Sequence, residues 1–451
     1  MQDRILELLE EKKYAELKNI LTELNSADIG EYFEAVPLGQ IALVFRLLPK
    51  ETAAEVFVEM DSEQQVALVG AFTDKELSAV LDELFVDDFA DIVEEMPAAF
   101  AKRLLKNADA ETRRAVNQVL AYPEDSAGSI MTTEYIDLKK GMTVEAAFEK
   151  IRRVGIDKET IYTCYVTNSK RELRGVVSAR QLLLAEPDSK IGDIMETELL
   201  FAYTHDDRET VAQMFDKYDM LALPIVDNEK RLIGIVTVDD AIDVLQEEAT
   251  EDIEKMAAIT PSEKAYLKTG VFDLFRSRIP WLLILMFSAT FTGMIIASFE
   301  AALASCVVLT AFMPMLMNTG GNSGSQSSVT VIRALSLGEV EFKDILRIIW
   351  KESRVSVLCG LVLSLLNFLK MWLFDLLLLH TSGLTISVIA VVSATLFFTV
   401  VIAKLVGCTL PVFAEKVGLD PAVMASPFIT TIVDAISLII YFSIASAILG
   451  I

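Results

Sequence analysis

Apolar positions in the first part of the chain recur at helical spacing in short segments. Each segment follows an Asp, Thr or Pro and begins with acidic residues, as in FTDKELSAVL at 72–81 and NADAETRRAV at 107–116. Such residues cap helix N-termini and complement the positive end of the helix dipole. Residues 1 to about 125 are therefore predicted to form a compact all-α domain of repeated short helices.

A unit of strand, helix, strand, strand and helix occurs twice in the next part of the chain. GSIMTTEYIDL at 128–138 recurs as GDIMETELLFA at 192–202, and RELRGVVSARQLLL at 171–184 recurs as KRLIGIVTVDDAID at 230–243. The alternation of strand and helix periods predicts two α/β repeats. An acidic helix is predicted over 239–258, and a linker then leads to the apolar half.

Five apolar stretches dominate the last part of the chain, and each is close to the roughly 20 residues that a helix needs to cross a bilayer. They are 279–299, 301–317, 355–379, 384–403 and 427–449. Lys and Arg gather before the first stretch, between the second and third, and around the loop between the fourth and fifth. The positive-inside rule predicts a multi-pass protein of the plasma (inner) membrane, with a cytoplasmic N-terminus and an extracytoplasmic C-terminus.

The second stretch continues into NTGGNSGSQSSVT at 318–330, which has no bulky side chain before Val329. One interpretation is a cytoplasmic Gly/Ser loop or a small-residue contact that lets helices approach closely. The alternative is an irregular pore-lining segment whose backbone carbonyls face water together with Asn318, Asn322 and Gln326, because irregular backbone at membrane depth must line a cavity or be buried in protein.

The last stretch carries one carboxylate, Asp434, near its middle. An aspartate there costs roughly 2.5–3.5 kcal/mol on insertion, so it is expected to face a partner or a pathway rather than lipid. Helical spacing puts Thr430, Thr431 and Ser437 beside it. One interpretation is a structural hydrogen bond or a pair with Lys370, and the other is a site for a hard cation such as Mg²⁺, which prefers oxygen ligands.

Charge divides the chain at about residue 275. The first part holds 56 of the 65 acidic and 30 of the 40 basic residues, a net charge of −26, whereas the rest carries +1. A strongly negative cytoplasmic half repels phosphates and attracts cations, so no nucleic acid partner is expected. The start of the chain has no pattern of a secretory signal. The four cysteines and two histidines are scattered, so neither a disulfide framework nor a zinc site is predicted.

Carboxylates are crowded at two places in the acidic half. In VDDFADIVEE, helical spacing places Asp87, Asp91 and Glu94 or Glu95 on one face, where like charges repel by a few tenths of a kcal/mol per pair. A solvated face and a site that needs a divalent cation are both open interpretations. The acidic helix over 239–258 is crowded further. It carries Asp240, Asp243, Glu247, Glu248, Glu251, Asp252 and Glu254.

The duplicated α/β unit resembles a tandem pair of cystathionine β-synthase (CBS) domains, a module that often binds adenine nucleotides and regulates an attached domain. Thr237 and Asp240 match the family's Thr-x-x-Asp ribose-phosphate motif, whereas the first repeat has Ser178 and Gln181 at those positions. The resemblance implies an ATP-type nucleotide site in the second repeat only.

The order of the parts resembles the MgtE family of magnesium channels along essentially the whole chain. PFITTIVDA at 427–435, GGNSGSQSS at 320–328 and EATEDI at 248–253 are the most specific pieces. The resemblance implies a multi-domain protein with an all-α acidic N-terminal domain, a tandem α/β CBS pair and a five-helix α transmembrane domain. The implied boundaries are 1–125 for the N domain, 126–253 for the CBS pair, 254–275 for a connecting (plug) helix and 276–451 for the pore domain.

The same resemblance implies a homodimer in the lipid bilayer, with Mg²⁺ as both substrate and regulator and Asp434 at the ion site. Asp420, in GLDPAV, would lie at the cytoplasmic mouth of the pore. Bound Mg²⁺ would hold the cytoplasmic carboxylates together in the closed state, and their repulsion would open the pore when the ion is scarce. The implied regulatory ligands are Asp87, Asp91, Glu209, Asp219, Asp240, Asp243, Glu248, Glu251 and Asp252.

Two other classes of protein remain as alternatives. One is a CBS-regulated carrier of another divalent cation or a small solute. A carrier of an organic solute or anion would want intramembrane bases or half-helix N-termini at its site, and only Lys370 suggests one. A membrane enzyme would need a nucleophile with a base, or a carboxylate–metal site with an open position. The sequence has no such combination, so an enzyme is not expected.

Overall fold

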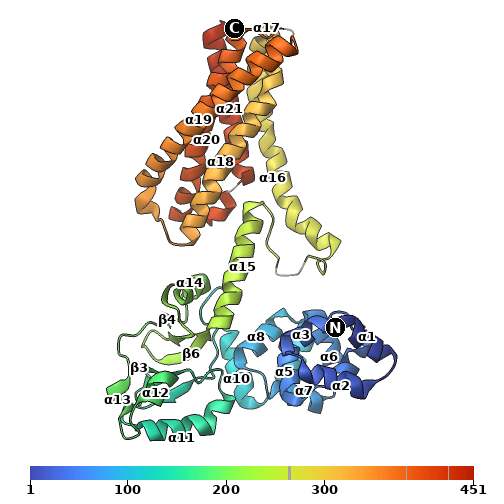
Figure 1. The fold of residues 1–451 in the computed structure, drawn as a ribbon, viewed down its shortest axis with the longest axis vertical. Coiled ribbons are helices and arrows are strands. Elements are labelled where there is room, and N and C mark those ends of the chain that lie inside the picture. The colour runs from blue at the N-terminus through green and yellow to red at the C-terminus, as the bar shows by residue number, and fades with distance from the viewer. Residues whose placement is uncertain (263–265, 382, 425, 451) are drawn as a thin grey trace. The chain divides into compact units, whose positions relative to one another are not determined.

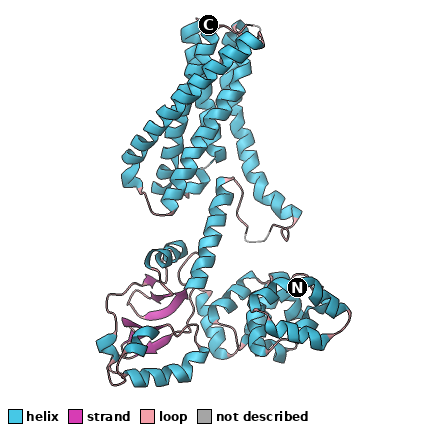
Figure 2. Ribbon diagram, viewed as in Figure 1, coloured by secondary structure: helices cyan, strands magenta, loops and turns pink. Residues whose placement is uncertain are grey.

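The computed structural model describes residues 1–262, 266–381, 383–424 and 426–450. The chain forms two compact units, Met1–Leu245 and the residues from Gln246 onward. The first unit contains short helices and two small sheets, and the second contains the long apolar helices (Figures 1 and 2).

The first unit begins with a series of short helices, as the capping pattern predicts. Asp61 accepts a hydrogen bond from the backbone N–H of Gln64, and Thr73 forms a capping box with Glu76. These side chains satisfy N–H groups that have no partner within the helix. The helices are α1 (Gln2–Glu10), α2 (Tyr14–Glu23), α3 (Ser26–Phe33), α4 (Leu38–Phe45), α5 (Lys50–Val58), α6 (Ser62–Ala71), α7 (Asp74–Leu81), α8 (Val86–Glu95), α9 (Ala98–Asn107) and α10 (Ala110–Val119).

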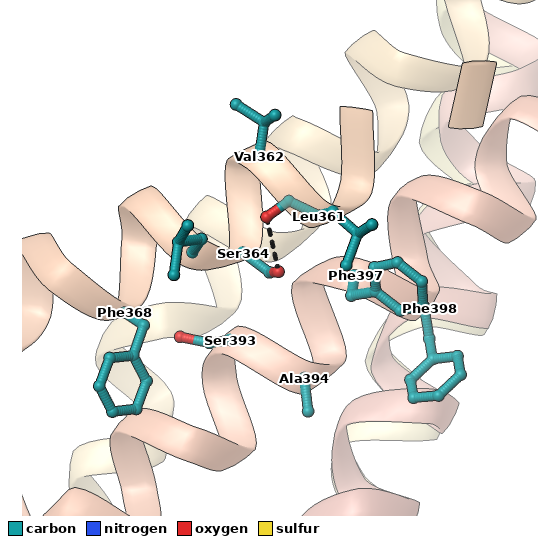
Figure 3. A pocket seen from close by; sticks show the side chains of 9 residues that line it. Leu361, Val362, Ser364, Phe368, Ser393, Ala394, Phe397 and Phe398 are labelled. Atoms are coloured by element: carbon teal, nitrogen blue, oxygen red, sulfur yellow. Dashed lines mark hydrogen bonds between the residues drawn. The ribbon is translucent and has the colours of Figure 1, made fainter. Parts of the chain in front are cut away.

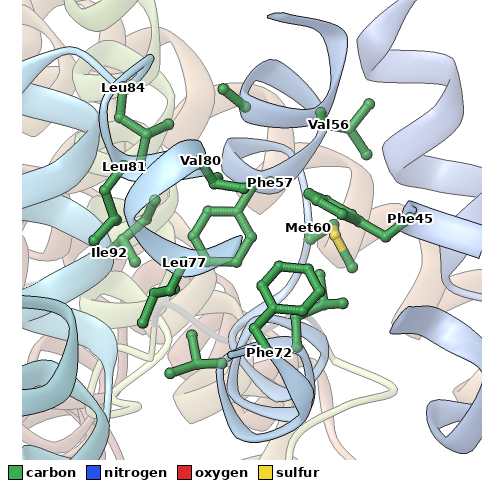
Figure 4. Packing of buried hydrophobic residues seen from close by; sticks show 14 of the residues in the cluster. Phe45, Val56, Phe57, Met60, Phe72, Leu77, Val80, Leu81, Leu84 and Ile92 are labelled. Atoms are coloured by element: carbon green, nitrogen blue, oxygen red, sulfur yellow. The ribbon is translucent and has the colours of Figure 1, made fainter. Parts of the chain in front are cut away.

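One continuous apolar core joins these short helices (Figure 4). The ring centroid of Phe45 lies 6.3 Å from that of Phe57 and 5.4 Å from that of Phe72. Helices of eight to ten residues are marginal on their own, so this shared core supplies most of their stability. It also fixes the direction of α8, which carries the first group of predicted ligands.

Two three-stranded sheets follow, and their matching topology confirms the duplicated unit. In each sheet the first strand pairs parallel with the second, and the second pairs antiparallel with the third. The first repeat comprises β1 (Ile136–Leu138), α11 (Val144–Val154), the 3₁₀ turn η1 (Gly155–Asp157), β2 (Thr163–Thr167), β3 (Leu173–Ser178) and α12 (Ala179–Leu184). The second comprises α13 (Ile191–Ile194), β4 (Ala202–Tyr203), α14 (Arg208–Tyr218), β5 (Ala222–Val226), β6 (Leu232–Thr237) and the start of α15 (Val238–Met256).

The second unit is helical. Its packing centres on α18 and α20, which contact each other along their length and also contact α21. The helices after α15 are α16 (Val271–Ser298), α17 (Glu300–Ser305), α18 (Met313–Ser336), α19 (Ile345–Lys370), α20 (Ile386–Lys416) and α21 (Ser426–Leu449). Shorter turns are η2 (Val307–Phe312), η3 (Phe342–Asp344), the π-helical η4 (Met371–Leu378) and η5 (Pro421–Met424).

Four helical segments of the described chain are long and apolar enough to cross a membrane, where the sequence predicts five spans. They are Val271–Ser298, Phe342–Leu378, Ile386–Lys416 and Pro421–Leu449. The prediction of a single apolar helix over 301–317 is wrong, because the chain forms α17, the 3₁₀ turn η2 and then the start of α18 there.

The irregular backbone considered for 318–330 is also wrong, because the whole segment is part of α18. Gly and Ser are weak helix formers in isolation. Here Gly320, Gly321 and Gly324 are buried against neighbouring helices, and tight packing outweighs the low propensity. The structure thus confirms the small-residue contact, whereas the pore-lining position of the three amides in this segment stays a prediction.

The region between the sheets and the first long helix differs from a continuous connecting helix over 254–275. Helix α15 ends at Met256, and the described residues 257–262 and 266–270 are not helical. Residues 263–265 lie outside the described part of the chain. The acidic helix predicted over 239–258 corresponds closely to α15.

Candidate functional site

The first group of predicted ligands lies in the first unit, on α8 and at the start of α15. Asp87 is 6% exposed, and its Oδ1 atom has no hydrogen-bond partner. The charge of Asp240 acts on both Asp87 and Asp91, so the fold brings these three predicted residues into one electrostatic environment.

This environment makes the carboxylates hard to ionise. Burial, followed by the charge of Asp240, raises the pKa of Asp87 well above its ordinary value. Lost hydration and neighbouring carboxylates raise the pKa of Asp91 to about 7, although its side chain reaches solvent. Burial raises the pKa of Asp240 to about 7 even though Thr237 donates a hydrogen bond to it. Groups in such an environment gain strongly from a nearby cation.

The fold adds acidic residues to this group that the sequence reasoning did not single out. Lost hydration and the charge of Asp240 raise the pKa of Glu159 to about 8, and lost hydration and Asp239 raise that of Asp88 to about 6. Asp88 and Asp239 stand next to predicted ligands in the sequence, which is a signal that could have found them. Glu159 follows η1 in an irregular segment and has no periodic signal.

The other predicted ligands of the second α/β repeat are more dispersed. Glu209 lies in the first turn of α14 and accepts a hydrogen bond from Gln213. Asp219 is the exposed C-cap of the same helix and has a left-handed backbone with φ 51°. Asp243 lies on the exposed side of α15.

Thr237 and Asp240, the predicted nucleotide pair, form a helix cap. The Thr237 hydroxyl donates to Asp240 Oδ2 at 2.5 Å, and the Thr237 N–H donates to the same atom at 3.3 Å. Ser178 and Gln181 form the corresponding capping box in the first repeat. Both repeats therefore use the same local geometry after their third strand, and only the second supplies a carboxylate.

A second group of carboxylates lies within the second unit, at the end of α15. Asp252 accepts a hydrogen bond of 2.9 Å from the hydroxyl of Ser336 on α18. Lys255 Nζ lies 2.6 Å from Asp420 Oδ2 and also contacts Glu251, one turn earlier on α15. The structure thus brings together the predicted residues Glu251, Asp252 and Asp420, with a lysine among them. Glu248 lies one turn earlier, partly exposed.

Asp434 lies half-buried on α21, and the structure gives its carboxylate no hydrogen bond or ion pair among the described residues. The hydroxyl of Thr431 donates to Pro427 and that of Ser437 to Val433, which are carbonyls of the same helix. Lys370 pairs with Asp375 at 2.7 Å, so it does not neutralise Asp434. Among the described residues, then, neither a structural hydrogen bond nor a pair with Lys370 is formed by Asp434.

An exposed face of α18 carries a row of amides. Asn318, Asn322 and Gln326 follow at intervals of four residues, and all three are exposed. Asn322 donates a hydrogen bond to Asn318 at 3.3 Å. We call this row the amide stripe. Gly321, beside the stripe, contacts Thr430 of α21. Thr430 lies one helical turn before Asp434, so α18 and α21 pack together at that turn.

Carboxylate oxygens are ligands that Mg²⁺ prefers. Oδ1 of Asp87 has no hydrogen-bond partner, so it could accept one more interaction. Within the described residues, no three His, Cys, Asp or Glu side chains are close enough to form a complete metal site.

A groove of about 550 Å³ lies between α19 and α20, and its lining is apolar, unlike the two carboxylate groups (Figure 3). Leu361, Val362, Phe397 and Phe398 line it, and its Ser364 hydroxyl donates to the carbonyl of Leu361. No charged side chain lines it, so it offers nothing to hold a cation.

Comparison with known protein families covers most of the chain. Residues 313–444 match the MgtE family, described as divalent cation transporters, and residues 24–125 match the MgtE intracellular N domain. Residues 127–188 and 191–247 each match the CBS domain. These matches agree with the helical domain, the paired sheets and the helical bundle of the structure.

Curated relatives and solved structures extend the likeness. The chain is 37% identical over 448 residues to the magnesium transporter MgtE of Thermus thermophilus, covering 98% of this chain and 97% of that protein. It is 36% identical over 450 residues to the magnesium transporter MgtE of Bacillus subtilis, covering 98% and 96%. These relatives are named as transporters and not as enzymes.

A crystal structure of the cytosolic domain of the Mg²⁺ channel MgtE in complex with ATP is also similar. It has a TM-score of 0.52 and 37% identity, covering 54% of this chain and all of that one. With relatives of this identity along nearly its full length, the apolar helices and the paired sheets have one common explanation: the chain belongs to the MgtE family of magnesium transporters, which are membrane proteins.

Proposed function

We propose that this chain forms a homodimeric, Mg²⁺-selective channel of the plasma membrane, with its N-terminus in the cytoplasm and its C-terminus outside. The ion path lies between the two membrane halves. The amide stripe and Asp434 line it, and Mg²⁺ bound to the cytoplasmic carboxylates closes it.

The observation that carries this proposal is the exposure of the amide stripe in a single chain. Asn318, Asn322 and Gln326 belong to a helix packed among long apolar helices, yet no described residue covers them. Polar side chains at membrane depth face protein or a water-filled cavity rather than lipid. A second copy of the chain across a water-filled path meets this requirement, and it gives the polar face of α18 a function.

Asp434 suits the selectivity of such a path. An unpaired carboxylate attracts cations, and two copies would double the charge at one level of the pore. Mg²⁺ dehydrates reluctantly and binds through few carboxylates with retained waters. A single carboxylate per chain beside neutral amides therefore favours a hydrated divalent cation.

Closure by Mg²⁺ follows from the cytoplasmic carboxylates. Asp87, Asp91 and Asp240 repel one another in a partly buried setting, and a divalent cation removes that repulsion. Glu251, Asp252 and Asp420 form a second acidic group at the end of α15. Binding at both groups compacts the cytoplasmic half and closes the path.

We further propose that ATP binds the second CBS repeat at Thr237 and Asp240. The similar cytosolic domain was solved in complex with ATP, which supports this site. Calorimetry on Thr237→Val should show weaker ATP binding, whereas Ser178→Ala, the matched change in the first repeat, should not. Equal affinities in both variants would remove Thr237 from the nucleotide site.

The alternative function is a carrier of another divalent cation or a small solute, regulated by the CBS pair. Fluxes in liposomes distinguish the two, because a channel gives passive Mg²⁺ flux that exceeds the flux of Mn²⁺, Co²⁺ and Ca²⁺. Absence of Mg²⁺ flux in the unmodified protein would refute the proposed function.

The residue-level test is Asp434→Asn, which keeps the shape of the side chain and removes its charge. We expect correct insertion and loss of most Mg²⁺ flux. Ser443→Ala is the matched control on α21, because the Ser443 hydroxyl only donates to Ile439 of its own helix. Unchanged flux in Asp434→Asn would return Asp434 to a structural role.

A further inference from the structure

Lys255 stands among the acidic residues at the end of α15, in the second unit. Its ammonium group lies 2.6 Å from Asp420 Oδ2 and contacts Glu251 as well. The side chains of Lys255, Glu251 and Asp420 are 26%, 33% and 34% exposed, so the group is partly shielded from water. Such ion pairs are screened less by salt than fully exposed ones.

The same carboxylate oxygens are those that the proposed function assigns to regulatory Mg²⁺. Asp420 Oδ1 accepts a hydrogen bond from the N–H of Ala422, which leaves Oδ2 to Lys255. Asp252 is turned toward Ser336. A Mg²⁺ ion that binds Glu251 and Asp420 must therefore displace the ammonium group from both.

We propose that Lys255 is an internal cation of this acidic group: it neutralises Glu251 and Asp420 when metal is absent and competes with divalent cations for them. This inference rests on the proposed function, because it concerns the regulation of the same transport. It assigns a role to a residue that is itself no metal ligand.

A lysine that competes with Mg²⁺ can be distinguished from one that only holds the two segments together, because its removal has opposite effects at low and at high Mg²⁺. Without the lysine, Glu251 and Asp420 repel each other in metal-free conditions, so the contact between the end of α15 and the segment before α21 loosens. When Mg²⁺ is bound to a chain without the lysine, however, there is no displaced ammonium group nearby to repel the ion. The metal-bound arrangement is then more stable than in the unmodified protein. Removal of Lys255 should therefore weaken closure at low Mg²⁺ and strengthen it at high Mg²⁺.

The test uses the full chain in liposomes with the variants Lys255→Met, which is close in shape and neutral, and Lys255→Arg, which keeps the charge. Mg²⁺ flux is recorded against internal Mg²⁺. We expect Lys255→Met to give more flux than the unmodified protein in Mg²⁺-free buffer and to reach half-closure at about three- to tenfold lower Mg²⁺. The two curves should cross, and Lys255→Arg should follow the unmodified protein.

Lys343→Met is the matched control, because Lys343 also pairs with a glutamate, Glu341, at 2.7 Å in the same unit, and both of these side chains are mostly exposed. A second readout is independent of transport. Limited proteolysis of the linker after α15 should be faster for Lys255→Met in Mg²⁺-free buffer, and protection should appear at lower Mg²⁺ than in the unmodified protein.

The outcomes separate the two proposals. If the unmodified protein carries no Mg²⁺, the proposed function fails, although the proteolysis still tests competition. If the unmodified protein works and Lys255→Met superimposes on it in both readouts, Lys255 has no role in the site. If Lys255→Met needs more Mg²⁺ for closure and for protection, Lys255 only holds the two segments together, and the proposed competition with Mg²⁺ is contradicted.

Discussion

Gly324 of α18 and Gly407 of α20 lie in direct backbone contact, so that a Cβ atom on Gly407 would overlap the carbonyl oxygen of Gly324. Backbone cannot move aside as a flexible side chain can. This contact sets the distance between the two helices. Gly324 is buried in it, whereas Asn322 and Gln326 of the amide stripe are exposed.

Gly407→Ala should therefore destabilise the membrane half. Forcing one methyl group into a filled backbone contact costs roughly 1–3 kcal/mol or more. A lower melting temperature in detergent would show this effect. Gly293→Ala is the matched control in α16, where a Cβ meets no atom within 4 Å, and its melting temperature should stay the same or rise slightly. Equal stability of the two variants would contradict the close contact.

Lys404 should contribute to stability through a buried polar network. It is 5% exposed on α20, and its Nζ lies 3.4 Å from the hydroxyl of Ser327, which donates to Glu352 Oε2 at 2.6 Å. The three residues join α20, α18 and α19. Lys404→Met should lower stability by about 1–2 kcal/mol, in the range of polar contacts between membrane helices.

A double-mutant cycle with Glu352→Gln tests that network. The two changes together should cost less than the sum of their separate costs, because each removes the other's partner. Lys351→Met, an exposed lysine on α19, should have little effect. Simple additivity of Lys404→Met and Glu352→Gln would mean that Ser327 does not couple them.

The first unit should be less stable at higher pH in the absence of Mg²⁺. The pKa values of Asp91 and Asp240 are raised to about 7 and that of Glu159 to about 8. Between their ordinary values near 4 and these raised values, the folded state holds protons that the unfolded state has released. The free energy of unfolding should then fall as pH rises from about 4 to 8 and level off above.

Thermal unfolding of the full chain from pH 5 to 8.5, with EDTA or with millimolar Mg²⁺, measures this dependence. Mg²⁺ should raise the melting temperature more at pH 8 than at pH 5, because protons occupy the carboxylates at low pH. A Mg²⁺ effect that does not depend on pH would mean that the ion binds elsewhere.

If the proposed function holds, gating should depend on the carboxylates of the first unit and of α15 and not on the ion path. We expect residues 1 to about 250 to resist protease at millimolar Mg²⁺ and to be cut faster without it. Neutralising Glu248, Glu251 and Asp252 together should blunt closure by internal Mg²⁺ while leaving the open-channel flux unchanged. Patch recordings of a chain without residues 1 to about 250 should show no closure by Mg²⁺. Closure in that truncated chain would place the sensor in the membrane half.

The sequence by itself determined the elements whose signals are local. Asp61, Thr73 and Asp109 are cap residues that satisfy N–H groups of their own helices, so the short helices could be predicted from neighbours in the chain. The duplicated α/β unit and the long apolar stretches are likewise local patterns. The carboxylate of Asp434 could be singled out because its residue type conflicts with its apolar surroundings.

Only the tertiary structure decided the features that depend on contacts between distant segments. The run of glycines and serines at 318–330 has weak intrinsic helix propensity, and it forms α18 because α20 and α21 pack against its small residues. Lys255 and Asp420 are far apart in the sequence, so their contact could not be read from spacing. Glu159 joins the acidic group of α8 for the same reason: electrostatic interactions depend on distance and burial in space, and a pattern along the chain records neither.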